Sequence, residues 1–179
     1  IQAYRLYTLA LAGIPDNGAM NRLKESLSCS DQAKWMLASA YSVCGKKNIA
    51  LDMISRTSTD IGSYPEADKT YGSSTRDKAL ALESFVLAGD VAKAMEIAED
   101  VAQEVSANGF TTQTGAFASV AMNRLHKSIS DKAIALEMTQ SKSITVNSAK
   151  ATDCWDLDPD TGSVTIRNTS DKPIYISVS

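Results

Sequence analysis

The chain has 179 residues, 44% hydrophobic and 22% charged, a balance that is typical of a folded globular protein and excludes a chain disordered throughout. The formal net charge of -3, with lysines and arginines scattered among acidic residues, leaves no basic surface for nucleic acid, so we expect no nucleic-acid partner. No stretch approaches the roughly 20 apolar residues that cross a bilayer, and the first residues lack the layout of a signal peptide.

Both ends of the chain lie inside regular patterns. Apolar residues already follow helical spacing near Ile1, where an initiator methionine would stand, and residues 174–179 alternate as a strand does. We therefore expect the chain to be part of a longer protein.

Three segments in the first part share one pattern: a helix, a glycine, a short turn and a second helix. They are residues 4–13 with 19–23, 33–45 with 50–54, and 77–89 with 94–98. Gly13, Gly45 and Gly89 stand where a residue beyond a helix end takes positive φ, which indicates helical hairpins. One hairpin does not bury its own apolar stripe, so we expect the hairpins to stack. The glycine spacings, 32 and then 44 residues, are too irregular for a tetratricopeptide array and favour an α/α ring.

The longer spacing comes from residues 57–73, a segment rich in turn formers, and long loops of this kind are usually functional or cover an edge. Ser74 or Thr75 is expected to cap the next helix, and a last helix is expected to begin near Thr112.

The period changes to two after about residue 128. The alternation is carried by apolar residues at Ile134, Leu136, Met138, Ile144, Val146, Val164, Ile166, Ile174, Ile176 and Val178. Turn clusters at 158–162 and 169–173 separate the later ones. About five strands with one buried face predict an incomplete antiparallel β-sandwich.

The predicted fold class is therefore α+β in separate domains, a partial α/α toroid followed by part of a β-sandwich. Helical hairpins are expected at about 3–55 and 75–127 and strands from about 131, with domains at 1–129 and 130–179. The predicted core comprises Leu9, Leu37, Ala40, Leu82, Val86, Ile97, Val120 and Met122.

No residue is assigned to a catalytic, cofactor-binding or metal site, and we expect no enzymatic activity from this chain. Cys29, Cys44 and Cys154 have neither the spacing nor the histidines of a zinc site, so we expect small buried or half-buried thiols. His126 is expected near a helix end, where a basic side chain meets exposed carbonyls. Acidic residues lie at Glu96, Glu99 and Asp100 on a solvated helix face, and at Asp158 and Asp160 in a turn.

Cys29 and Gln32 allow two interpretations. A spacing of three residues at a helix start can bring a thiol and a side-chain amide together, as an internal thioester requires. Ser28 with Asp31 is also an ordinary capping box, and an exposed first turn does not protect a thioester from water. The capping interpretation is favoured.

Several segments together resemble the thioester-type domain of bacterial alpha-2-macroglobulin-like proteins. They are residues 4–13 (YRLYTLALAG), 18–23 (GAMNRL), 33–38 (AKWMLA), 70–77 (TYGSSTRD) and 111–118 (TTQTGAFA). The last two are the most specific, and the likeness runs from about residue 1 to 127. Residues 167–175 (RNTSDKPIY) resemble the CUB-like β domain that flanks this domain in the family.

The resemblance implies an α/α toroid in an extracytoplasmic protein, periplasmic or anchored in the envelope, that traps proteases. A bait segment elsewhere is cut, the protein rearranges, and the attacking protease is caged. The partners implied are proteases and neighbouring β domains of the same chain, and the chain alone is expected to self-associate. The family's Cys-x-Glu-Gln thioester belongs to an earlier part of the toroid, and Asp31 stands where that motif has Glu, so the thioester is not assigned to Cys29. The alternatives are a helical-repeat scaffold for protein partners in the cell envelope and part of an α/α-toroid enzyme.

Overall fold

The computed structural model describes residues 1–26, 29–62, 64, 72–108, 111–130, 134–140, 143–148, 153–157, 162–170, 174 and 176. The chain divides into two compact parts, Ile1–Leu125 and His126–Ser179, called here the helical unit and the β unit. Over the described residues it forms α1 (Gln2–Leu11), α2 (Asn17–Lys24), α3 (Asp31–Val43), α4 (Lys47–Ile54), α5 (Ser74–Ala88), α6 (Val91–Asn108), α7 (Thr112–Ser130), β1 (Ile134–Thr139), β2 (Ser143–Ser148) and β3 (Thr165–Asn168). The predicted mixed α+β class is confirmed.

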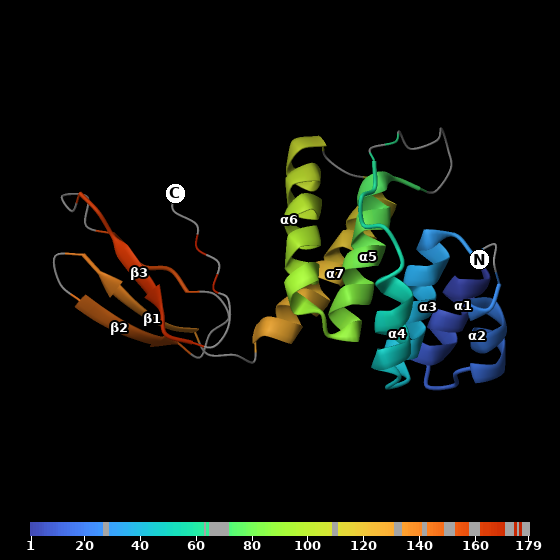
Figure 1. Ribbon diagram of the computed structural model, residues 1–179. Helices are drawn as coiled ribbons and strands as arrows, with labels where there is room; N and C mark the ends of the chain where they lie inside the picture. The colour runs from blue at the N-terminus through green and yellow to red at the C-terminus, as the bar shows by residue number, and fades with distance from the viewer. Residues whose placement is uncertain are drawn as a thin grey trace. The chain divides into compact units, whose positions relative to one another are not determined.

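The helical unit is built from hairpins whose first helices lie side by side. Within the hairpins, α1 packs on α2, α3 on α4 and α5 on α6, while α3 lies between α1 and α5 (Figure 1). We call α1, α3 and α5 the odd-helix layer. None of the described helices is long and apolar enough to cross a membrane.

Glycine closes the first helix of each hairpin, as the sequence predicts. Gly13, Gly45 and Gly89 have φ values of 78°, 76° and 97°, a left-handed region that disfavours residues with a Cβ. At each turn the next residue donates its backbone N–H to a carbonyl five residues earlier. These bonds run from Ile14 to Leu9 at 3.0 Å, from Lys46 to Tyr41 at 2.8 Å and from Asp90 to Phe85 at 3.0 Å. This bond ends the helix and turns the chain back.

The core follows the helical stripes. In α1 the buried residues are Ala3, Leu6, Tyr7 and Ala10, which recur at the spacing of one helix face. The prediction of a buried position is confirmed for Leu37, Ala40, Leu82, Val86 and Ile97. It is wrong for Val120, which is exposed, while Leu9 and Met122 are half-buried.

Two predicted helix caps are displaced. Ser73, not Ser74 or Thr75, caps α5, because its hydroxyl accepts the backbone N–H of Arg76 at 3.0 Å. Ser30 caps α3 and accepts from Ala33 at 3.4 Å, whereas the predicted cap Ser28 lies outside the described residues. In both places more than one nearby hydroxyl residue satisfies the sequence pattern, and only the backbone geometry selects one.

The β unit contains a three-stranded antiparallel sheet in the order β2-β1-β3. Leu136 and Met138 of the central strand are buried, as the alternation predicts, and they pair with Val146 and Ile144 on β2. Ile174 and Ile176 lie outside the three strands, and the rest of the predicted last strand, like most of the turn at 158–162, lies outside the described residues.

Candidate functional site

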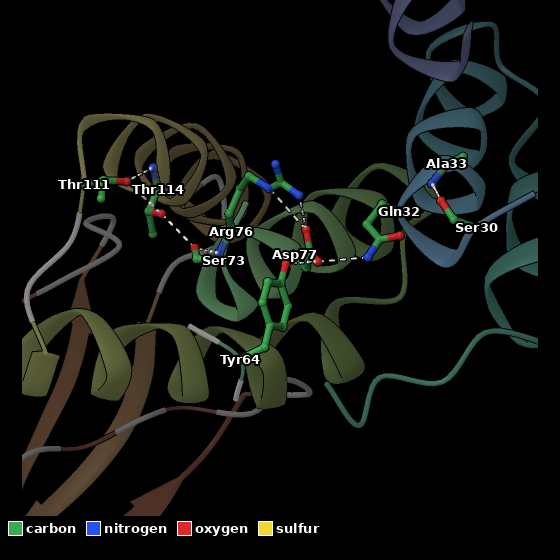
Figure 2. Close-up of polar contacts among 9 residues, drawn as sticks. All are labelled: Ser30, Gln32, Ala33, Tyr64, Ser73, Arg76, Asp77, Thr111 and Thr114. Carbon is green, nitrogen blue, oxygen red and sulfur yellow. Dashed lines mark hydrogen bonds and ion pairs between the residues drawn. The ribbon is translucent and has the colours of Figure 1, made fainter. Parts of the chain in front are cut away.

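Polar side chains gather at the N-terminal ends of α3, α5 and α7. Figure 2 shows Ser30, which caps α3, Ser73, which caps α5, and Thr111 and Thr114 at the start of α7. Asp77, in the first turn of α5, is bonded to Gln32 of α3. Helix N-termini carry exposed N–H groups and partial positive charge, so hydroxyls and a carboxylate are favourable there.

Asp77 is the centre of the first cluster. It is fully buried, in the first turn of α5. Its Oδ1 accepts from Nε and Nη2 of Arg76, at 3.1 and 2.7 Å. Its Oδ2 accepts from Gln32 Nε2 at 2.9 Å and from the Tyr64 hydroxyl at 2.6 Å. We call these four residues the Asp77 cluster (Figure 2).

The Asp77 carboxylate is saturated with donors. Its two oxygens accept four hydrogen bonds, about the number of lone-pair sites that a carboxylate has. A carboxylate in this state has no free site for a substrate proton or a metal ion. The cluster therefore joins three parts of the chain, namely α3, α5 and the segment before α5.

Tyr64 belongs to the long segment that the sequence marks out between residues 57 and 73. Its hydroxyl donates to Asp77, and Figure 2 shows the ring reaching the carboxylate from the side opposite Arg76. Burial, the hydrogen bond to Asp77 and the charge of Asp77 together raise the pKa of Tyr64 to about 12. The tyrosine is therefore neutral, and a donor, at physiological pH.

Two hydroxyls join α5 to α7. Ser73 Oγ lies 2.8 Å from Thr114 Oγ1, and both residues are buried. Thr111 Oγ1 accepts the backbone N–H of Thr114 at 3.3 Å at the start of α7. The helix predicted near Thr112 is thus confirmed, and its first turn is bonded to the cap of α5 (Figure 2).

Two observations on Cys29 and Gln32 count against the thioester interpretation. The Gln32 amide nitrogen is bonded to Asp77, on another helix. Burial raises the pKa of the Cys29 thiol, Asp31 adds to this effect and Lys34 opposes it, so the reactive thiolate is disfavoured. This geometry favours the structural role of Gln32.

A second buried carboxylate, Glu83, lies further along α5. Its Oε1 accepts from the Tyr7 hydroxyl of α1 at 2.7 Å and from Arg124 Nε of α7 at 2.6 Å. We call these three residues the Glu83 cluster. Burial, and next the charge and hydrogen bond of Glu83, raise the pKa of Tyr7 strongly, so this tyrosine also remains a donor.

The Tyr7 contact passes over an intervening helix. Packed helices lie about 8–10 Å apart, so in a flat layer the axes of α1 and α5 would be separated by roughly twice that distance, with α3 between them. Tyr7 and Glu83 meet at 2.7 Å because they pass α3 on one side of the layer. In the middle of α3, the small buried residues Ala38, Ser39 and Ala40 lie between the larger buried residues Leu37 and Tyr41. These two long side chains thus join the first and third helices of the odd-helix layer across α3.

A third group links α5 to α6 nearer the surface. Glu104 accepts from Lys78 Nζ at 2.6 Å and from the Thr75 hydroxyl at 2.7 Å. Burial alone would raise the pKa of Glu104, but the two hydrogen bonds and the charge of Lys78 outweigh it and hold this pKa below its usual value.

The other residues singled out in the sequence are not brought together. His126 lies exposed on α7, four residues before the helix ends, and Glu96, Glu99 and Asp100 are exposed on α6 as predicted. Asp158 and Asp160 lie outside the described residues. The three cysteines are free thiols. Cys29 and Cys44 are half-buried as expected, while Cys154 is exposed, so the prediction is wrong there. In the described part of the chain, no group of three or more potential metal ligands occurs.

The sequence interpretation did not assign a role to the residues of the Glu83 cluster, or to Tyr64 and Asp77. One local signal existed. Glu83 interrupts the apolar stripe of α5 between Leu80 and Val86, and a charge on a predicted buried face requires a partner. Its partners are 76 and 41 residues away in sequence, and no spacing rule identifies them.

No protein-family model matches this chain, and neither a curated protein nor a solved structure matches it.

Proposed function

We propose that this chain is part of a bacterial alpha-2-macroglobulin-like protein that inhibits proteases by trapping them, and that it has no catalytic activity of its own. The segments that carry the resemblance include residues 70–77 and 111–118. The described side chains of these two segments include Ser73, Arg76, Asp77 and Thr114, which hold α3, α5 and α7 together. The two segments that are most specific for the resemblance thus have a structural role within the helical unit, which is to connect its helices.

The stacking of the hairpins is the observation that carries the proposal: α3 lies between α1 and α5, and each of these is the first helix of a hairpin. An α/α toroid is built from helical hairpins stacked so that their first helices lie side by side, and the helical unit has this arrangement. We extend this to the finer fold: the helical unit is an arc of a toroid, and the β unit is part of a CUB-like sandwich.

In such an inhibitor the helical unit would act as a rigid body. Both buried carboxylates of α5 are held by hydrogen bonds from other helices, so the unit would keep its shape while the larger protein rearranges after a bait segment is cut. The proposed partners are proteases, met by the whole protein, and neighbouring β domains. The proposed location is extracytoplasmic, in the periplasm or anchored to the envelope.

Two substrates of different size test the trapping mechanism. The intact protein that contains this chain is incubated with trypsin, and cleavage of casein is compared with cleavage of a short chromogenic peptide. A cage excludes the large substrate and admits the small one, so casein cleavage should fall while peptide cleavage persists. Equal inhibition of both substrates, or inhibition of neither, would reject trapping. Trypsin inactivated at its active site is the control, because it does not cut the bait and should not be retained.

A helical scaffold for protein partners is the second candidate, and one observation favours it. Tyr4, Leu11 and Ile14 expose 53%, 50% and 66% of their surface at the α1 edge of the helical unit. Grouped apolar side chains of this kind often contact another protein. A scaffold would hold its partner without any bait cleavage, so retention of the inactivated trypsin, or of an uncleaved partner, would favour this candidate.

A further inference from the structure

The Glu83 cluster connects the first and last helices of the helical unit through one oxygen atom. Tyr7 on α1 and Arg124 on α7 both donate to Glu83 Oε1, at 2.7 and 2.6 Å. Glu83 itself is buried, with a side chain only 6% exposed, whereas the Arg124 side chain is 31% exposed. The two donors are therefore held by one desolvated acceptor and do not act independently.

We propose that Glu83 is a positioning residue, through which the position of α7 depends on the position of α1. This dependence is a conformational coupling built into the fold, and it stands whether or not the proposed function is correct. Glu83 takes no part in the Asp77 cluster, which has its own donors nearer the start of α5.

The coupling follows from the cost of a poorly satisfied buried carboxylate. If Tyr7 no longer donates, the charge on Glu83 keeps a single partner in a site with little access to water. Water then has to replace the lost donor. The partly exposed Arg124 side chain marks the side where water can enter, so admitting water requires the C-terminal half of α7 to move away from α5. By the same argument, loss of Arg124 loosens α1.

The position of α7 gives this coupling a consequence for the whole chain. The boundary between the two compact units falls after Leu125, one residue beyond Arg124, so α7 is the covalent link between them. A change on α1 would reach the helix that leads into the β unit without any change in α3, the neighbour of both α1 and α5.

Hydrogen exchange of the full chain tests the proposal. In Tyr7→Phe, we expect exchange of the α7 amides near Arg124 to quicken about tenfold, because a hydrogen bond to a charged group is lost. In Arg124→Met, we expect a similar increase along α1. Tyr41→Phe is the matched control: it removes a tyrosine hydroxyl bonded to Asn21 at 2.7 Å, between α3 and α2, and should leave α7 exchange unchanged.

A double-mutant cycle separates coupling from ordinary loss of stability. The effect of Arg124→Met on the unfolding equilibrium constant should change at least about threefold when Tyr7 is already Phe. This difference should become smaller in a Glu83→Gln background, because the amide oxygen still accepts but carries no charge. Additive effects of the two substitutions, or unchanged α7 exchange in Tyr7→Phe, would overturn the proposal. If Glu83→Gln does not fold, the cycle between Tyr7→Phe and Arg124→Met still decides the outcome.

Discussion

Gln32 Nε2 lies 2.9 Å from Asp77 Oδ2, so the second residue of α3 is bonded to the first turn of α5 across 45 residues of chain. This bond uses the amide that an internal thioester would need. It also makes Asp77, which has no exposed surface, the point where two helices and the Tyr64 segment meet. The stability of the helical unit should therefore be unusually sensitive to this carboxylate.

Asp77→Asn should lower the free energy of unfolding by about 3 kcal/mol, because it removes the charge of a fully buried carboxylate that is paired with Arg76 at 2.7 Å. Chemical denaturation measures this change. The matched control is Asp52→Asn, which breaks an ion pair with Arg56 in which both side chains are exposed, and which should cost less than about 1 kcal/mol. Equal losses in the two variants would contradict the structural role of Asp77.

Tyr64→Phe should reduce the loss of stability at high pH. The pKa of Tyr64 is raised from 10.0 to about 12 in the folded protein, so folding holds the proton more tightly than the unfolded chain does. The stabilisation from Tyr64 is complete below pH 10 and is lost as the pH rises towards 12. The difference in unfolding free energy between wild type and Tyr64→Phe, followed from pH 9 to 12, should shrink. A constant difference would show that the hydroxyl does not donate to Asp77.

Gly89→Ala should destabilise the chain by about 1 kcal/mol, since alanine is strained at a φ of 97°. An added Cβ would meet only Lys47 Nζ, at 3.9 Å, so crowding contributes little and the backbone conformation decides the effect. Gly62→Ala is the control, because an added Cβ there contacts nothing within 4 Å and no positive φ is involved, so it should be neutral or slightly stabilising. Thermal unfolding of both variants distinguishes the two cases.

Local features of this fold could be predicted from sequence, whereas contacts between distant residues could not. The hairpin turns at Gly13, Gly45 and Gly89 were predictable because a left-handed helix end is decided by a few adjacent residues. The cap of α5 lies one or two residues before the predicted position, at Ser73, and the cap of α3 lies two residues after it, at Ser30, since nearby hydroxyls are equivalent in a sequence pattern. The Asp77 and Glu83 clusters depend on how helices pack, and their partners lie up to 76 residues apart. Periodicity predicts that a face is buried but does not identify the partner of a charge on it.

The chain should not capture primary amines at Cys29. Burial raises the pKa of this thiol, and the Gln32 amide is bonded elsewhere, so neither half of a thioester is prepared to react. The chain is incubated with a labelled primary amine and resolved on a denaturing gel, beside Cys29→Ser. We expect no label in either protein. Label that enters wild type and is lost in Cys29→Ser would restore the thioester interpretation.

The isolated chain should self-associate, chiefly through the exposed side of α1. Tyr4 and Leu11 are seven residues apart and share one helix face, and Ile14 follows just beyond the helix end. The three are exposed apolar side chains whose removal from water is favourable. Sedimentation velocity should show a weight-average mass that rises with concentration, and Leu11→Glu combined with Ile14→Glu should suppress the rise.

A second surface competes with this explanation, and one control separates the two. Ile144 on β2 is half exposed, and β2 lies at an edge of the described sheet, where another chain could add a strand. Ile144→Lys places a charge at that edge. If association passes through α1, Ile144→Lys should associate as wild type does and the α1 double variant should not. The reverse result would assign association to the sheet edge. A wild-type chain that remains a monomer at every concentration would contradict both explanations, because neither surface would then bind a second copy.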